Sequence, residues 1–202
     1  MVWPAVINGM KRICVFCGSS TGIRPAYADA ARRTGSALVR RGIGLVYGGG
    51  CVGLMGTIAD AVIDGSGEVI GIIPEALVDR ELAHREVTEL IIVRSMHERK
   101  AKMAEMSDAF IALPGGYGTF EEFCEIITWA QLGLHRKPCG VLNVEGYYDP
   151  LLSLFDRAVD EGFVHAANRL LVIQETDPDR LLDMVMNYVP PRMEKWIGRD
   201  DS

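Results

Sequence analysis

The chain has 202 residues, of which 49% are apolar and 24% are charged, so its composition predicts a globular fold with a full hydrophobic core. Its net charge of −6 argues against a nucleic-acid polymer as partner and leaves small ligands, including an anion held at a locally basic site. The sequence shows neither an apolar run long enough to span a bilayer nor a signal-peptide pattern in residues 1–12, so we expect no membrane association and a cytoplasmic location.

Short apolar segments typical of strands alternate along the chain with segments of helical periodicity. Glycine or proline ends several of them. The predicted strands cover residues 12–17, 43–47, 68–73, 89–93, 109–113, 139–143 and 170–174. The predicted helices cover residues 26–41, 54–64, 96–106, 120–132, 150–161 and 177–188, and residues 190–202 form a polar tail.

This alternation predicts one α/β domain over residues 1–202, with its core at about 12–189. We expect a doubly wound, Rossmann-like parallel sheet with helices on both faces. In such sheets, ligands bind at the carboxyl ends of the strands. The richest loops, at 18–20, 48–53 and 115–119, all follow predicted strands, so the site is expected among them.

The most informative segment is Pro114-Gly115-Gly116-Tyr117-Gly118-Thr119, which leads from a buried strand into a helix. Glycines let the backbone approach an anion closely, and the amides and dipole of a helix N-terminus attract phosphate. The 115–119 loop is therefore a candidate phosphate-binding loop. A tight strand-to-helix turn explains the same glycines, and Thr119-x-x-Glu122 also fits a capping box in which Glu122 only caps the helix.

Two adjacent cations, Arg99 and Lys100, fall in the first turn of the predicted helix 96–106. The helix dipole disfavours positive charge there, which suggests that these side chains face an anion. The alternative is an ordinary solvated helix face. Because this helix and the 115–119 loop follow consecutive strands, we expect Arg99 to lie near that loop.

A second glycine motif, Gly48-x-Gly50-x-x-Gly53, matches the letters of the dinucleotide-binding fingerprint. It lies on the second strand–helix unit instead of the first, so a glycine wall beside a sugar or base is the preferred interpretation. An NAD-dependent oxidoreductase stays an alternative and would need this loop to bind the diphosphate. No P-loop is present, and we predict no cofactor.

The five cysteines are scattered and odd in number, which indicates reduced thiols. Cys14 and Cys17 form a C-x-x-C within a β-branched run. A redox pair needs its first cysteine at a helix N-terminus, so core packing is preferred. Because the histidines are dispersed, we predict no metal site.

Taken together, the segments 114–122 and 96–100 resemble the paired motifs of the Lonely Guy (LOG) family, P-G-G-x-G-T-x-x-E with an upstream R-K pair. The resemblance runs from Ile13 to about Val189 and includes Val15-Phe16-Cys17-Gly18-Ser19-Ser20, Tyr47-Gly48-Gly49-Gly50 and Ile126-Ile127-Thr128-Trp129-Ala130-Gln131. The combination is specific, whereas each piece alone is not. The family is often labelled lysine decarboxylase, a name that these residues do not support.

The resemblance implies a cytokinin riboside 5′-monophosphate phosphoribohydrolase, which cleaves an N6-modified AMP, and commonly AMP, into free base and ribose 5-phosphate. It also implies a dimer or a higher multiple of dimers, with sites at the dimer interface. By motif position, Arg99 and Glu122 would be the catalytic pair. The nucleotide site would be lined by Glu81, Arg99, Lys100, Gly115, Gly116, Tyr117, Gly118, Thr119, Phe120, Glu121 and Thr128, with the motif around Glu81 the weaker match.

The chemistry agrees with these roles. Cleavage of a glycosidic bond builds positive charge on the sugar, which a carboxylate such as Glu122 can stabilise while it activates water. A phosphate held on the 115–119 loop would place the anomeric carbon. Arg99 would bind either the phosphate or the leaving base, and the sequence leaves both open. A nucleotide-binding carrier or sensor on the same fold stays an alternative, although it would have no need of Glu122.

Overall fold

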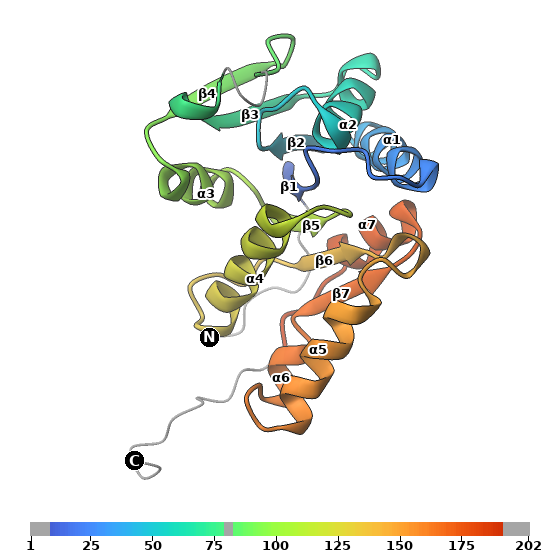
Figure 1. The fold of residues 1–202 in the computed structure, drawn as a ribbon, viewed down its shortest axis with the longest axis vertical. Coiled ribbons are helices and arrows are strands. Elements are labelled where there is room, and N and C mark those ends of the chain that lie inside the picture. Colours follow the sequence, from blue (N-terminus) through green and yellow to red (C-terminus); the bar gives the residue numbers. More distant parts are fainter. Residues whose placement is uncertain (1–8, 79–82, 192–202) are drawn as a thin grey trace.

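The computed structural model describes residues 9–78 and 83–191 and has the predicted alternation of strands and helices (Figure 1). Its strands are β1 (Arg12–Phe16), β2 (Gly44–Tyr47), β3 (Val69–Pro74), β4 (Glu89–Val93), β5 (Ala109–Ala112), β6 (Cys139–Leu142) and β7 (Val172–Glu175). Its α-helices are α1 (Pro25–Arg40), α2 (Gly53–Asp64), α3 (Met96–Glu105), α4 (Tyr117–Gln131), α5 (Asp149–Asp160), α6 (Ala166–Arg169) and α7 (Pro178–Met186). Two short 3₁₀ turns, η1 (Glu75–Leu77) and η2 (Val144–Gly146), complete the described chain.

Within the described ranges the strands form one seven-stranded sheet in the order β4-β3-β2-β1-β5-β6-β7, and every paired neighbour is parallel. The chain builds outward from β1 to β4 on one side and then returns to place β5 against the other side of β1. The strand order therefore reverses between β1 and β5. Open α/β sheets bind ligands at such a switch point, beyond the carboxyl ends of the strands. The doubly wound fold predicted from the sequence is confirmed.

Alternating side chains of the central strands supply two separate cores. Ile13 and Val15 of β1 pack in the cluster that also contains residues of α1, α2 and α7. Cys14 and Phe16 face the opposite way, into the cluster that contains residues of α3, α4 and α5. Both faces of the sheet are covered by helices, which explains why the strand sequences are apolar without polar alternation.

The start of α4 differs from the prediction. The helix begins at Tyr117, three residues before the predicted start, and its N-cap is Gly116, without a side-chain cap. Thr119 is therefore inside the first turn, and Glu122 lies in the second turn. The capping-box interpretation of Thr119 and Glu122 is wrong, because the glycines that counted against helix in the sequence form the helix start.

The short helix α6 was not predicted, since four residues are too few to show a helical period. The other boundaries agree to within about two residues, which is the usual uncertainty of helix and strand ends. Among the described residues, none of the helices has the length and apolar character needed to cross a membrane.

Candidate functional site

The loops after β1 and β5 meet at the switch point. The amide of Gly18, after β1, donates to the carbonyl of Pro114, after β5, over 3.1 Å. A Cβ on Gly18 would lie 3.2 Å from Cα of Gly115, so the two loops are in close backbone-to-backbone contact. The predicted convergence of the 18–20 and 115–119 loops is therefore present.

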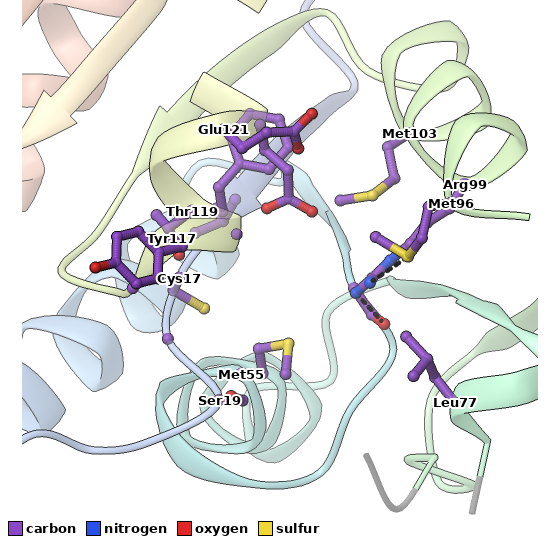
Figure 2. Close-up of a pocket in the computed structure, with 17 residues that line it drawn as sticks. Cys17, Ser19, Met55, Leu77, Met96, Arg99, Met103, Tyr117, Thr119 and Glu121 are labelled. Atoms are coloured by element: carbon purple, nitrogen blue, oxygen red, sulfur yellow. Dashed lines mark hydrogen bonds between the residues drawn. The ribbon is translucent and has the colours of Figure 1, made fainter. Parts of the chain in front are cut away.

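A cavity of about 270 Å³ opens beside this contact, at the carboxyl ends of β1, β2 and β5. The start of α4 forms one wall and α3 forms the opposite wall (Figure 2). Its lining consists of Val15, Phe16, Cys17, Gly18, Ser19, Gly48, Met55, Leu77, Met96, Arg99, Met103, Gly116, Tyr117, Gly118, Thr119, Glu121 and Glu122. Seven of the predicted site residues are among them: Arg99, Gly116, Tyr117, Gly118, Thr119, Glu121 and Glu122.

The first turn of α4 presents backbone amides to this cavity. Gly116 caps the helix with backbone alone, no acidic residue lies in the first turn, and the amide of Phe120 donates to the carbonyl of Gly116 over 3.1 Å. The amides of residues 117–119 come before this first hydrogen bond of the helix, so, as at any helix N-terminus, they have no acceptor within the helix. Around both Gly116 and Gly118, the position of a Cβ is open space. An anion can therefore approach the positive end of the helix dipole closely.

The second glycine loop, residues 48–53, uses its helix N-terminus differently. The amides of Leu54 and Met55 both donate to the carbonyl of Gly18, over 3.0 and 3.3 Å. Gly53 has φ +63°, and a Cβ there would overlap the backbone of Ser19. These glycines thus allow the β1 loop to sit on the start of α2. The diphosphate interpretation required for an NAD enzyme loses its anion site, because a backbone carbonyl already occupies it.

Arg99 is buried, with 5% of its surface exposed, and reaches the cavity from α3. Its Nε donates to the carbonyl of Ile72, within β3, over 3.1 Å. Its Nη2 donates to the carbonyl of Gly48, just after β2, over 2.9 Å (Figure 2). A Cβ on Gly48 would overlap Nη2. The alternative of a solvated helix face is wrong for Arg99, because the carbonyls of Ile72 and Gly48 hold its buried guanidinium inside the site.

An apolar group surrounds Arg99 and was not predicted. Met96 and Met103 flank it on α3, Met55 faces it from α2, and Leu77 lies on the other side (Figure 2). The spacing of Met96, Arg99 and Met103 is i, i+3 and i+7, which places them on one helix face. This i, i+3, i+7 spacing is the feature of the sequence from which the apolar group could have been predicted. Flexible methionine side chains fit flat or irregular apolar ligands.

Lys100 contacts α4 and does not line the cavity. Its Nζ donates to Glu121 over 2.5 Å and to Glu125 over 3.0 Å, and only 12% of its side chain is exposed. Burial lowers the pKa of Lys100, but the hydrogen bonds to Glu121 and Glu125 outweigh this effect and raise the pKa above its ordinary value. Lys100 therefore connects α3 with α4, because it follows Arg99 on α3 and pairs with Glu121, which precedes Glu122 on α4.

The thiol of Cys17 reports the electrostatics at the cavity floor. Burial raises its pKa well above the ordinary value, the nearby carboxylate of Glu122 raises it further, and Arg99 opposes this effect. Burial, with Glu122, raises the pKa of Cys14 in the same direction. Both thiols stay protonated, which confirms packing in place of a redox pair for C-x-x-C. Glu122 and Arg99 are both close enough to act on the same buried atom.

The remaining predicted residues lie elsewhere. Gly115 lines a neighbouring cavity of about 290 Å³ and is covered by Thr119, whose Oγ1 a Cβ on Gly115 would overlap. Phe120 packs its ring against Tyr147 and Tyr148. Thr128 lies farther along α4, in a separate cavity of about 150 Å³ between α4, α5 and α6. Glu81 lies outside the described residues, so its role stays a prediction.

Comparison with known proteins links this site to a family. Residues 55–185 match a family model described as possible lysine decarboxylase. The chain is 55% identical to cytokinin riboside 5′-monophosphate phosphoribohydrolase LOG2 of Arabidopsis thaliana, over 89% of this chain and 84% of that protein. It is 54% identical to cytokinin riboside 5′-monophosphate phosphoribohydrolase LOG of Oryza sativa subsp. japonica, over 89% of this chain and 74% of that protein.

Among solved structures, the fold is similar to a molybdenum cofactor binding protein of Rippkaea orientalis, with a TM-score of 0.67. That match covers 88% of this chain and 96% of the other at 22% sequence identity. At this identity the likeness shows the shared fold alone. The sequence matches go further, since they cover most of both chains at more than half identity: the chain belongs to the Lonely Guy family, whose model carries the lysine decarboxylase description.

Proposed function

We propose that the protein hydrolyses the N-glycosidic bond of cytokinin riboside 5′-monophosphates, and of AMP, to the free base and ribose 5-phosphate. The observation that carries this proposal is one cavity that joins the open N-terminus of α4, an anion site, with Glu122 and the buried Arg99. The relatives that share more than half of the sequence are named for this activity. The cavities beside Thr128, beside Gly115 and beside Met10 each lack at least one of these three features.

The 5′-phosphate is bound by the amides of the first turn of α4. Gly116 and Gly118 leave space for its oxygens, and the helix dipole adds to the attraction. Lys100 is engaged by Glu121 and Glu125, so backbone amides carry most of the phosphate binding. Holding the phosphate fixes the ribose and therefore places its anomeric carbon in the cavity.

Glu122 acts on the ribose. It lies in the second turn of α4, farther along the same helix than the amides that bind the phosphate. Positive charge develops on the sugar as the glycosidic bond breaks, and a carboxylate stabilises it. The same carboxylate takes a proton from the attacking water. Phosphate binding and catalysis are thus positioned by one rigid helix.

Arg99 faces the base. It lies across the cavity from Tyr117 and Thr119, among Met55, Met96 and Met103 (Figure 2). The guanidinium is directed by the carbonyls of Ile72 and Gly48, not by the start of α4. In this position it steadies the departing purine, while the methionines contact the flat base and its apolar N6 substituent. We therefore assign Arg99 to the leaving base, one of the two partners that the sequence left open.

Ribose 5-phosphate release tests the proposal. AMP, an N6-prenylated AMP and the matching N6-prenylated nucleoside are incubated with the protein side by side. We expect release from both monophosphates and no cleavage of the nucleoside, because the nucleoside lacks the group that the α4 amides bind. Equal cleavage of nucleoside and monophosphate would refute the role of the 115–119 loop. Nucleotide binding without any cleavage would favour the carrier alternative.

We also propose that the active form is a dimer or a multiple of dimers working in the cytoplasm. Apolar side chains past the end of α4 are exposed, with Leu132 at 67% and Leu134 at 69%, and Phe163 after α5 reaches 78%. Thr128 lines the adjacent shallow cavity, which a second copy would cover. Light scattering at assay concentration tests this, and a fully active 22.2 kDa monomer would contradict it.

A further inference from the structure

The turn before α4 has each of three consecutive carbonyl groups held by a donor from another part of the chain. The hydroxyl of Tyr148 donates to the carbonyl of Leu113 over 2.6 Å. The amide of Gly18 donates to Pro114 over 3.1 Å. The hydroxyl of Tyr147 donates to the carbonyl of Gly115. Two adjacent tyrosines of the β6–α5 connection therefore act on the loop that leads into the anion site.

The contact at Gly115 has a consequence for the next amide. In a trans peptide the carbonyl of one residue and the N–H of the following residue point in opposite directions within one plane. Fixing the Gly115 carbonyl toward Tyr147 therefore directs the Gly116 N–H away from Tyr147. Gly116 lines both this neighbouring cavity and the cavity that holds Arg99, whereas Gly115 and Tyr147 line the neighbouring cavity and not the one that holds Arg99.

We propose that Tyr147 is a positioning residue, whose hydroxyl orients the Gly115–Gly116 peptide so that the Gly116 amide binds the substrate phosphate. This inference rests on the proposed function, since it assigns a support to the same phosphate site. A glycine pair has little conformational preference of its own. An external hydrogen bond is therefore the means by which this peptide keeps one orientation when the site is empty.

The structure holds Tyr147 firmly enough for this task. Its ring contacts Tyr27 edge-on at 5.6 Å between centroids and Tyr148 at 5.2 Å. It also stacks on Phe120, in the same helix as the anion site, at 6.4 Å. All three ring contacts survive in Tyr147→Phe, so this variant removes the hydroxyl without removing the packing.

Tyr148 supplies a matched control. Tyr148→Phe also removes a hydroxyl that donates to a carbonyl of this turn. The peptide that it holds joins Leu113 to Pro114, and proline has no N–H to direct at a ligand. Tyr148 is buried, so its variant should lose stability without a specific loss of phosphate binding.

Calorimetry with ribose 5-phosphate measures phosphate binding directly and needs no turnover. Because a hydrogen bond to a charged group is at stake, we expect the dissociation constant to rise about tenfold in Tyr147→Phe and by less than about twofold in Tyr148→Phe. The KM for N6-prenylated AMP should rise with it, while kcat changes less. The melting temperature should fall more in Tyr148→Phe than in Tyr147→Phe.

Equal affinities for ribose 5-phosphate in wild type and Tyr147→Phe would overturn the inference, as would equal losses in the two variants. Failure of the proposed function looks different, because the wild type itself would then release no ribose 5-phosphate. The binding measurement still decides the role of Tyr147 in that case. A wild type that does not bind ribose 5-phosphate would overturn both.

Discussion

The 48–53 loop carries four glycines and the 115–119 loop carries three, each between a buried strand and a helix, yet the protein uses the two loops for different purposes. In the first, the amides at the start of α2 are taken by the carbonyl of Gly18, and Gly53 makes room for the backbone of Ser19. In the second, the start of α4 lines a cavity, and Gly116 and Gly118 adjoin open space.

This comparison shows that a glycine motif identifies close approach but not the partner. Backbone from the same chain and phosphate from a ligand both require the absence of a Cβ. What separates the two loops is whether the amides of the helix N-terminus already have an acceptor within the protein. The 48–53 loop matches G-x-G-x-x-G, but its helix amides already have an acceptor within the protein. The proposed ligand site is therefore at the 115–119 loop.

The largest expected effect is on catalysis at α4. Glu122→Gln removes the carboxylate but keeps the shape, and hydrolysis should fall roughly a hundredfold or more, as for loss of a general base. Because Gly116 is the cap of α4, the melting temperature should stay close to that of the wild type. Glu125→Gln is the control, since Glu125 lies on the same helix and pairs with Lys100. A Glu122→Gln variant with a normal rate of ribose 5-phosphate release would remove Glu122 from the mechanism.

The packing loop should respond mainly in stability. Gly53→Ala places a Cβ against the backbone of Ser19 at φ +63°. Left-handed strain and overpacking together should lower the free energy of unfolding by roughly 2–4 kcal/mol. Urea denaturation measures this. An alanine variant as stable as the wild type would show that the two loops are less tightly packed than the geometry requires.

Arg99→Lys tests the link between the two loops, because Arg99 bonds to Gly48 and faces the start of α4. A lysine cannot reproduce the planar fork that reaches both Gly48 and Ile72. Most of the activity should be lost, and the free energy of unfolding should fall by about 1–3 kcal/mol because a buried acceptor loses its donor. Full activity of the lysine variant would show that the fixed guanidinium plane is not needed.

The ligand loop should respond with the opposite sign in stability. Gly118→Ala places a methyl group in open space within the first turn of α4. Alanine favours helix over glycine, so the free energy of unfolding should rise by up to about 1 kcal/mol. The affinity for ribose 5-phosphate should fall because the methyl group occupies the approach of the phosphate. A variant that gains both stability and affinity would contradict the assignment of this loop.

Much of the fold followed from the sequence, because the helices show a helical period of apolar residues and the strands are short apolar runs between them. The rules for parallel sheets predicted the doubly wound arrangement. The strand order, with its reversal between β1 and β5, comes from the structure. The exception that matters is the start of α4, where Gly116 and Gly118 suggested a loop. Gly116 is the extended N-cap and Gly118 lies in the first turn of the helix. Tertiary contacts decide this start, such as the cover that Thr119 gives to Gly115.

The sequence predicted the main residues of the candidate site but not the contacts that hold them in place. The 115–119 loop, Arg99 and Glu122 carry local signals, and the structure brings them together. Arg99 is held by the backbone carbonyls of Ile72 and Gly48. Every residue has such a carbonyl, so the sequence does not show which ones accept from Arg99. The contact of Tyr147 with Gly115 joins residues 32 apart in the chain, and no local pattern reports it.

Backbone amide chemical shifts during a titration with ribose 5-phosphate test the difference between the two loops most directly. The protein is labelled with ¹⁵N, and the shifts of both loops are followed in one experiment. We predict that the largest changes occur at Gly116, Tyr117, Gly118 and Thr119, and that the amides of residues 50–55 change little. Larger changes at residues 50–55 than at residues 116–119 would show that the phosphate binds at the start of α2 and would contradict the account.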